Sequence, residues 1–382
     1  MKQGTNWQLI QKKVIFLLSA NDLGGVTKFS LNLIKELQQS GVECQIHVPF
    51  FTHFYYTKNI RAKRNLSDIK MWIRYFLGQF RLELKERKLK FCGEKLGISD
   101  IKANRYLFRP SKRLLKNASF VIIQQSGLFQ QLIGLGLDFE RIIIVVHHSF
   151  TNKILDLKNK EGKLANIVAS STFTGKILSE LGADKLDLIP LGVDIDLYNP
   201  TNRTRFNDGN IHIGFYYHPH SRKNPELVKF LVQYISTYED IKFIVHIFGH
   251  EFKTDLESNN VIFHKFLSEI KYSTAIANLD VFVFCSNIEG FGLPPLEAMS
   301  SGVSVVTSRV GAVSDYMNDS SGIIINPESP SIIWINAILE VSRHKLIRDQ
   351  FSVNARQSAE NFSWSQTSNL YLNLMNRIES GR

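Results

Sequence analysis

The stretch that decides the fold runs from Glu289 to Gly302 and reads Glu-Gly-Phe-Gly-Leu-Pro-Pro-Leu-Glu-Ala-Met-Ser-Ser-Gly. One apolar run, 281–285, precedes it, and a second, 303–308, follows it. The two adjacent prolines suit the first turn of a helix, where a missing N–H does no harm, and the last glycine suits the position just past a helix end. The pattern therefore predicts a strand, a loop, a short helix and another strand.

The loop and the helix start within this stretch combine free backbone N–H groups with two carboxylates. We expect the backbone N–H groups of Phe291, Gly292 and Leu293 to point into a crevice at a helix N-terminus, which favours an anion. Ionised Glu289 and Glu297 can only accept hydrogen bonds, which suits sugar hydroxyls. For a single glutamate, a helix cap or a solvated loop residue is the simpler interpretation. A phosphate position between two such carboxylates instead favours a nucleotide sugar.

The whole string resembles the Glu-x7-Glu signature of retaining glycosyltransferases of family 4, which have the GT-B fold. A second segment, 185–194, resembles the Ile-Pro-x-Gly-Val-Asp sequence that closes the N-terminal half of these proteins. The resemblance implies an α/β protein with two Rossmann-like domains facing each other across a cleft. It also implies a hexosyltransferase-type enzyme that retains anomeric configuration, with Gly290 among the residues that contact the donor.

Strand and helix patterns alternate along both halves of the chain, as parallel sheets with crossover helices require. The first half begins with a buried strand at 14–19, an apolar helical stripe at 26–39 and a strand at 43–49. Further strands are predicted at 119–124, 141–146, 166–169, 211–216, 242–248, 261–264 and 281–285, and helices at 225–236, 269–277 and 365–378.

The polar stretch 199–210 contains Pro, Asn, Asp and Gly and is the natural linker between two domains. We therefore expect an N-terminal, acceptor-side domain at 1–198, with a basic insertion at about 52–118, and a nucleotide-sugar-binding domain at 199–362. The family resemblance implies that the last segment, 363–382, is a helix that crosses back to the N-terminal domain.

Two features of the N-terminal half are candidates for donor contacts. Gly24 and Gly25 lie between the first strand and its helix, where glycine allows close backbone approach and leaves the helix N-terminus to a phosphate. An ordinary turn is the alternative. His147 and His148 end an apolar strand, at the edge where ligands bind in open α/β sheets. The resemblance implies a functional histidine here, near the donor sugar, and the strand register leaves open which of the two it is.

Arg222 and Lys223 follow the first strand of the second half. Fixed cations there would neutralise a diphosphate leaving group, which protein side chains must do because the sequence contains no metal motif. Many relatives have an arginine about six residues before the lysine, where this chain has Tyr217, and we expect Arg222 to compensate. A solvated turn is the alternative. Gly249 and His250 resemble a glycine-rich turn near the nucleotide. No cofactor and no metal are expected besides the donor.

Positive charge is concentrated in one part of the chain. The stretch 51–120 contains 18 Lys and Arg against 5 Asp and Glu, which leaves 28 against 30 for the remainder. Within it, the segment 66–90 places Trp72, Phe76 and Phe80 on one face of a helix flanked by basic residues. Contact with an anionic membrane or a lipid-linked acceptor is slightly favoured. A core-facing stripe and a nucleic-acid surface are the alternatives.

Length and composition are typical of a two-domain globular protein. A chain of 382 residues exceeds one ordinary core, and 44% hydrophobic with 21% charged residues suits a soluble protein. Cys44, Cys92 and Cys285 are odd in number and lack metal-ligand spacing, which argues for a reducing compartment. The apolar run after Lys13 is better explained as a strand than as a signal peptide, and no run approaches the ~18 residues of a spanning helix. We expect a cytoplasmic protein, at most attached to the inner face of the membrane.

Together these features predict transfer of a sugar from a nucleotide diphosphate donor to a carbohydrate or lipid-linked acceptor, in cell-surface polysaccharide or glycolipid synthesis. The alternative is a catalytically silent GT-B-like protein that binds a sugar or a protein partner. Nucleic acid is not expected as a partner, and the oligomeric state is not predicted. The candidate catalytic residues are His147, His148, Glu289, Arg222 and Lys223, and the candidate donor-binding residues are Gly24, Gly25, Gly249, His250, Gly290, Phe291, Gly292, Leu293 and Glu297.

Overall fold

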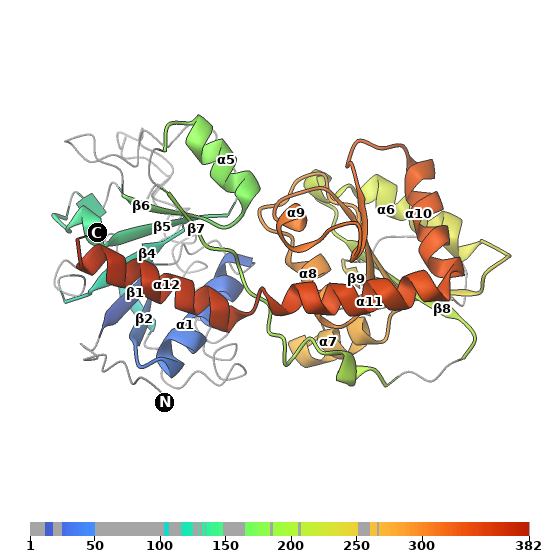
Figure 1. Cartoon of the computed structure of the whole chain (residues 1–382), viewed down its shortest axis with the longest axis horizontal. Helices are drawn as coiled ribbons and strands as arrows, with labels where there is room; N and C mark the ends of the chain where they lie inside the picture. Colours follow the sequence, from blue (N-terminus) through green and yellow to red (C-terminus); the bar gives the residue numbers. More distant parts are fainter. Residues whose placement is uncertain are drawn as a thin grey trace, which may run out of the picture.

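The computed structural model consists of two domains, each built on a parallel sheet (Figure 1). Most of the basic stretch, including Trp72, Phe76 and Phe80, lies outside the residues that the structure describes, and so does Cys92. The described residues are 12–17, 25–49, 103–106, 115, 117–124, 129, 132–133, 135–147, 165–183, 186–204, 208–250, 260–265 and 267–381.

The N-terminal sheet has the strand order β3-β2-β1-β4-β5-β6-β7, and every neighbouring pair is parallel. Its central strands are apolar throughout because a parallel sheet is covered on both faces. The side chains of 14–17 in β1 and 142–146 in β5 are at most 2% exposed. The strands are β1 (Lys13–Leu17), β2 (Glu43–Pro49), β3 (Ala103–Tyr106), β4 (Phe120–Ile123), β5 (Ile142–Val146), β6 (Asn166–Ala169) and β7 (Leu186–Leu188), with helices α1 (Gly25–Gln39) and α5 (Thr172–Glu180) and the 3-10 turn η1 (Phe139–Arg141).

The C-terminal sheet has the order β10-β9-β8-β11-β12-β13 and is also wholly parallel. Its strands are β8 (Ile211–Tyr217), β9 (Phe243–Gly249), β10 (Val261–Lys265), β11 (Val281–Phe284), β12 (Ser304–Ser308) and β13 (Gly322–Ile325). The helices are α6 (Pro225–Ser236), α7 (Glu269–Ala277), α8 (Leu293–Ser300), α9 (Val313–Tyr316), α10 (Ser331–Arg343), α11 (Lys345–Glu360) and α12 (Trp364–Glu379), with 3-10 turns η3 (Pro200–Asn202) and η4 (Ser221–Lys223).

The predicted fold class is confirmed, because two α/β units with parallel sheets are what the alternating pattern required. The strand predicted at 43–49 is β2, and the helix predicted at 26–39 is α1, which begins one residue earlier. Two strands, β3 and β13, were not predicted. β3 lies inside the stretch assigned to the basic insertion and pairs with β2 at the sheet edge. Its sequence, Ala-Asn-Arg-Tyr, lacks the apolar run by which the central strands were recognised.

The strand order of each sheet reverses next to the first strand of its domain. In the N-terminal sheet the reversal lies between β1 and β4, and in the C-terminal sheet between β8 and β11. Ligands of open α/β sheets bind outside the carboxyl ends of the strands at such points. The segments that follow β8 and β11, 218–224 and 285–292, contain most of the candidate residues of the C-terminal domain.

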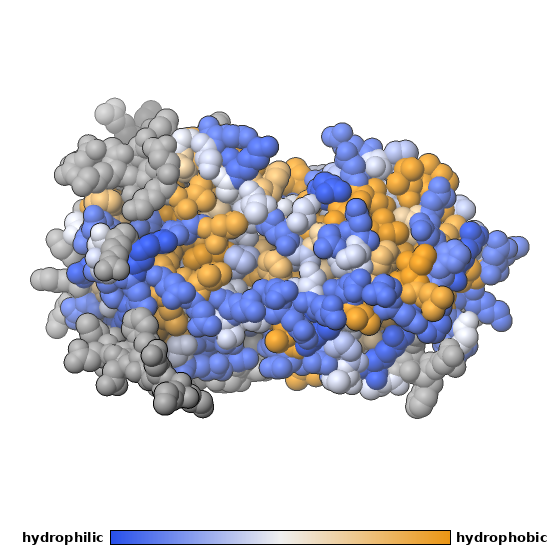
Figure 2. Space-filling view, viewed as in Figure 1, coloured by the Kyte–Doolittle hydropathy of each residue, from blue (hydrophilic) through white to orange (hydrophobic). Residues whose placement is uncertain are grey.

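The helix α12 leaves the C-terminal domain and lies against α1 of the N-terminal domain (Figure 1). The chain meets the N-terminal domain just before this helix, where the N–H of Val193 donates to the carbonyl of Phe362 at 2.7 Å. Trp364 and Tyr371 are buried, with ring centroids 6.0 and 6.1 Å from that of Phe29 in α1. The outer surface of α11 and α12 forms a hydrophilic band across both domains (Figure 2).

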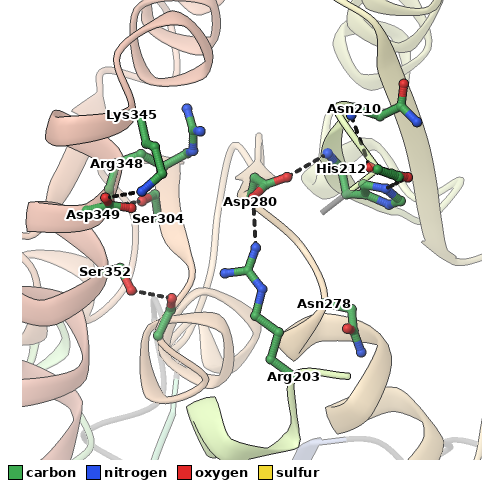
Figure 3. Close-up of polar contacts among 12 residues, drawn as sticks. Arg203, Asn210, His212, Asn278, Asp280, Ser304, Lys345, Arg348, Asp349 and Ser352 are labelled. Atoms are coloured by element: carbon green, nitrogen blue, oxygen red, sulfur yellow. Dashed lines mark hydrogen bonds and ion pairs between the residues drawn. The ribbon is translucent and has the colours of Figure 1, made fainter. Parts of the chain in front are cut away.

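The linker is fixed to the C-terminal domain at the edge where its strands begin (Figure 3). Asp280, directly before β11, accepts hydrogen bonds from Nη2 of Arg203 and from the backbone N–H of His212, both at 2.9 Å. Arg356 in α11 donates to the carbonyl of Tyr198 at 2.9 Å. These contacts anchor the connection between the domains on the side away from the carboxyl ends of β8 and β11.

Candidate functional site

Lys223 and Glu289 form an ion pair at the strand-order reversal of the C-terminal sheet, with Nζ 2.5 Å from Oε1. Lys223 lies in η4 after β8, and Glu289 lies in the loop after β11. The ammonium is also 5.4 Å from the ring centroids of Tyr216 and Phe284, within the range of a cation–π interaction. The Lys223 and Glu289 side chains are 22% and 13% exposed. The pair is therefore held by its surroundings and still accessible to a ligand.

Backbone hydrogen bonds hold these two segments together. The N–H groups of Asn287 and Ile288 both donate to the carbonyl of Arg222, at 2.8 and 3.3 Å. Asn224, which follows Lys223, is the one non-glycine residue with positive φ (50°) among the described residues, a left-handed conformation that asparagine tolerates. The Arg222 side chain itself is exposed. The turn is thus tied to the loop after β11 by backbone hydrogen bonds.

The N-terminus of α8 is available to an anion. Gly292 occupies the N-cap position with φ 92°, and no side chain caps the helix. A Cβ on Gly292 would meet the hydroxyl of Tyr316 at 3.1 Å, and that hydroxyl donates to the Gly292 carbonyl at 2.7 Å. Within the described part of the chain, the N–H groups of Phe291, Gly292 and Leu293 donate to no protein acceptor. Such N–H groups and the helix dipole favour negative charge.

At Gly290 the two domains are in direct backbone contact. A Cβ at this position would lie only 2.2 Å from the carbonyl oxygen of His147, which follows β5. The His147 ring is anchored in its own domain, because Nε2 shares a 2.8 Å hydrogen bond with Oε1 of Gln124 and the ring stands edge-on to Phe29 at 4.9 Å. His147 therefore meets the C-terminal domain through its carbonyl group. His148 lies outside the described residues.

A lysine from the N-terminal domain pairs with Glu297. Nζ of Lys28, in α1, lies 2.6 Å from Oε1 of Glu297 in α8 and 2.8 Å from Oε1 of Glu269 in α7. Burial by itself lowers the pKa of Lys28, but the charges of Glu297 and Glu269 outweigh it and raise that pKa above its usual value. Lys28 is therefore charged at neutral pH. Glu297 is only 5% exposed, so its carboxylate depends on this partner from the other domain.

A second cross-domain contact involves Asp315 in α9, for which no role was predicted. The N–H of Thr172, the first residue of α5, donates to Oδ2 of Asp315 at 2.8 Å, and the Thr172 hydroxyl donates to the same carboxylate. A carboxylate at a helix N-terminus satisfies N–H groups that have no partner within the helix and complements the helix dipole. Asp315 therefore holds α5 against the C-terminal domain.

Tyr217 cannot act at the site in place of an arginine. Its side chain is 4% exposed and packs with Val228 and Trp334 in the core on the α6 and α10 face of the sheet. Its carbonyl accepts a 3.0 Å hydrogen bond from the N–H of His250. Gly249 has φ 104°, and a Cβ there would lie 2.4 Å from the same carbonyl oxygen. Only glycine fits this turn, which holds His250 beside the end of β8.

The predicted site residues that the structure describes are found mostly at the facing edges of the two sheets. Gly25 is the first residue of α1, and Gly24 lies outside the described residues. Sequence reasoning missed Lys28, Glu269 and Thr172, because a contact across a domain boundary depends on how the domains are placed and leaves no local pattern. Within the described segments, no helix has both the length and the apolar character to cross a bilayer, and no three His, Cys, Asp or Glu side chains are grouped to hold a metal ion.

Comparison with known proteins finds similarity to glycosyltransferases. Residues 202–358 match the family described as "Glycosyl transferases group 1". The chain is 26% identical over 227 residues to the D-inositol 3-phosphate glycosyltransferase of Paenarthrobacter aurescens (strain TC1), covering 54% of this chain and 55% of that protein. The chain thus spans about half the length of this curated relative, and between 20% and 64% of the length of other curated relatives.

Solved structures resemble the protein over nearly its whole length. A glycosyltransferase from Rickettsia africae ESF-5 superposes with a TM-score of 0.71 at 15% identity, covering 98% of this chain and 100% of that one. Anabaena Alr3699/HepE in complex with UDP and glucose superposes with a TM-score of 0.69 at 14% identity, covering 96% and 99%. At these identities the likeness establishes the fold, which is GT-B.

Proposed function

We propose that this protein is a glycosyltransferase that transfers a sugar from a nucleotide diphosphate donor to a carbohydrate or lipid-linked acceptor, with retention of anomeric configuration. The single observation that carries the proposal is the Lys223–Glu289 pair, in which Glu289 lies three residues before the N-cap residue of α8. Lys223 provides a fixed cation, Glu289 can accept hydrogen bonds from hydroxyls, and the backbone N–H groups at the start of α8 have no protein acceptor among the described residues. These groups lie at the point where open α/β sheets bind ligands.

The pair suggests how a donor would enter. In the protein alone, Lys223 and Glu289 neutralise each other at 2.5 Å. A diphosphate would replace Glu289 as the partner of Lys223, with further N–H donors from the Phe291–Leu293 segment. Glu289 would then accept hydrogen bonds from the hydroxyls of the transferred sugar. The charge that develops on the departing diphosphate is stabilised by groups that are already in place.

The N-terminal domain would complete the site from the opposite side. Lys28 pairs with Glu297, and the His147 carbonyl contacts Gly290, so both ends of the Glu-x7-Glu stretch meet the other domain. Holding donor and acceptor in one geometry lowers the barrier by removing translational and rotational freedom beforehand. In this proposal His148 and the Gly24–Gly25 turn lie near the donor, with Gly249 and His250 near the nucleotide.

The acceptor class and the hexosyl group are proposals that rest on relatives. The curated proteins that match include a D-inositol 3-phosphate glycosyltransferase and a phosphatidyl-myo-inositol mannosyltransferase, and both names contain an inositol compound. These names support a role in cell-surface polysaccharide or glycolipid synthesis. Retention is proposed from the Glu-x7-Glu resemblance. Protein cations would take the place of a metal, so activity should be the same with Mg²⁺ and with EDTA.

Ligand-dependent stabilisation tests the proposal directly. The protein is heated with UDP-, GDP-, ADP- and dTDP-sugars, and a donor at 100 times its Kd should add about 2.7 kcal/mol to the free energy of unfolding. Turnover is then followed as release of the nucleoside diphosphate with and without candidate acceptors. Folded protein that binds none of these donors contradicts the proposal.

A catalytically silent binding protein is the second candidate, favoured by one observation. Tyr217 is buried in the core, so the position at which many relatives have an arginine offers no cation here. Slow donor hydrolysis without acceptor distinguishes the two functions. An active enzyme releases nucleoside diphosphate. Glu289→Gln should lower the rate of release about 10- to 150-fold, whereas Glu328→Gln, at an exposed control position, should leave it unchanged. The silent protein binds donor and releases nothing.

Contact with an anionic membrane is proposed from the basic stretch alone. Each Lys or Arg near an acidic surface should contribute about 1 kcal/mol, reduced by salt. Replacing Trp72, Phe76 and Phe80 by Ser should release the protein from acidic liposomes in a sedimentation assay while its melting temperature stays nearly constant. Loss of the melting transition, with no liposome binding by the wild type at low salt, would favour a core-facing stripe.

A further inference from the structure

Three histidines gather at the ends of β8 and β9, next to Lys223. The ring centroid of His218 lies 4.5 Å from that of His250 and 6.4 Å from that of His220. His218 directly follows β8, His220 precedes η4, and His250 is held by its N–H bond to the carbonyl of Tyr217. His218 and His220 have no part in the proposed function so far.

Backbone hydrogen bonds fix which nitrogen of two of these rings carries the proton. The N–H of His220 donates to Nδ1 of His218 at 3.1 Å, and the N–H of Arg222 donates to Nδ1 of His220 at 3.2 Å. A nitrogen that accepts a hydrogen bond cannot itself be protonated, so each neutral ring carries its proton on Nε2. Both side chains therefore present an Nε2–H donor without needing a positive charge.

The surroundings keep His218 neutral. Burial lowers its pKa, and the nearby groups His250, Lys223, His220 and Arg222 lower it further by repulsion. Protonation at Nδ1 would in addition break the hydrogen bond from the His220 N–H. Glu289, a carboxylate at this end of the sheet, is already paired with Lys223. The cluster therefore has an excess of donors and positive charge, which suits a ligand with several anionic oxygens.

We propose that His218 and His220 are anion-binding residues whose Nε2–H groups donate to the diphosphate of the bound nucleotide, beside Lys223. The identity of this anion as part of a nucleotide sugar rests on the proposed function. A neutral imidazole N–H orients a phosphate oxygen but binds it less strongly than a lysine or arginine does. The donor carries no positive charge, so the attraction between opposite charges is missing. The diphosphate product therefore leaves the site more easily than it would leave a second arginine.

The test uses paired substitutions that separate the two ring nitrogens. The amide N–H of glutamine reaches about as far as Nε2 of histidine, whereas the shorter asparagine places its amide group near Nδ1. His218→Gln should therefore keep the affinity for a nucleoside diphosphate within about threefold, and His218→Asn and His218→Ala should each weaken it about tenfold. A purely structural role of His218, through Nδ1, predicts the opposite order, with His218→Asn behaving like the wild type.

Calorimetry measures binding of UDP, GDP, ADP and dTDP, of inorganic pyrophosphate, and of the matching nucleosides. Nucleoside affinity should stay constant in all variants, and His344→Ala, at an exposed histidine that caps no helix by its side chain, should behave like the wild type. Melting curves confirm that each variant is folded. Long-range ¹H–¹⁵N spectra at pH 7.5 should show His218 as the neutral Nε2–H tautomer. The Nδ1–H tautomer or a charged ring overturns the proposal.

The outcomes separate this proposal from the proposed function. If the wild type binds no nucleoside diphosphate but binds pyrophosphate in a His218-dependent way, the anion site stands and the glycosyltransferase function fails. If the wild type binds a nucleoside diphosphate and all His218 and His220 variants bind it equally well, the function stands and this site is refuted. Failure of the wild type to bind either ligand refutes both.

Discussion

Replacing Gly290 by alanine tests whether the observed domain contact is the working arrangement. The added Cβ would lie 2.2 Å from the carbonyl oxygen of His147. A carbon and a carbonyl oxygen normally stay about 3.3 Å or more apart, so the two backbones must separate by about 1 Å. The φ angle of Gly290 is not in the left-handed region, so the clash is the main cost of the substitution.

The magnitude follows from the cost of overpacking, about 1–3 kcal/mol. Because opening the domains relieves the clash, this cost falls on the closed arrangement and leaves each domain folded. We expect kcat/KM to fall about 5- to 150-fold in Gly290→Ala, since a displacement of this size disturbs the geometry of reaction. Binding of a nucleoside diphosphate alone should change little, because its proposed ligands Lys223 and the α8 N-terminus belong to the C-terminal domain.

Steady-state kinetics, calorimetry and small-angle X-ray scattering measure the three quantities. Scattering should show a larger radius of gyration for Gly290→Ala in the presence of donor. Gly175→Ala is the matched control, because a Cβ on this helical glycine would meet only ordinary contacts at 3.7 Å. Wild-type kcat/KM and an unchanged radius in Gly290→Ala would refute the reasoning. A collapse of the melting temperature would refute it too, because the clash would then disrupt a domain core.

Three further changes give measurable results. Glu289→Gln should lower kcat/KM about 10- to 150-fold, from about 1.5–3 kcal/mol lost in hydrogen bonds to a charged group, with an almost constant melting temperature; a wild-type rate would remove Glu289 from the site. Lys28→Met leaves Glu297 and Glu269 without their cation and should lower the free energy of unfolding in urea by about 1–3 kcal/mol. This is at the low end for buried ion pairs, because the Lys28 side chain is 31% exposed. Equal stability of the variant would show that the ion pair contributes nothing. Burial lowers the pKa of His47 to about 4, so between pH 6.5 and pH 4 the unfolded chain binds a proton that the native protein does not. The free energy of unfolding should therefore fall by about 3 kcal/mol as the pH drops over this range. His47→Gln should flatten this pH dependence, and an unchanged pH profile would contradict the assignment.

Local pattern was enough to predict the secondary structure around the site. The two prolines and Gly302 bracket α8 within a few residues, because proline and glycine constrain the backbone at those positions regardless of the rest of the fold. The apolar runs of β1, β5 and β11 also predict strands directly. A strand of a parallel sheet is covered on both faces, so its sequence is a continuous apolar run that differs clearly from a polar loop. β3 lacked this signal because it lies at the sheet edge.

Contacts between distant segments could not be predicted in the same way. Tyr216 and Tyr217 are adjacent in β8, so the sequence does not show which of the two side chains faces the α6 side of the sheet. In the structure, where β8 pairs with β9, the Tyr217 side chain lies in the core on that side. Asp315 and Thr172 are unremarkable polar residues in sequence, and their contact exists only because α5 and α9 face each other. Likewise, the choice between Nδ1 and Nε2 of His218 depends on a backbone N–H two residues away, whose direction a sequence does not reveal.

The position of α12 has a consequence for biosynthesis. The ribosome completes the N-terminal sheet long before it produces Trp364 and Tyr371, the residues that cover Phe29 on α1. Until the entire C-terminal domain has been translated, that aromatic surface stays open to water and to other nascent chains. We therefore expect the first domain to finish folding only after the second has emerged, and chaperones that shield apolar surface during translation to matter most for this protein in that interval.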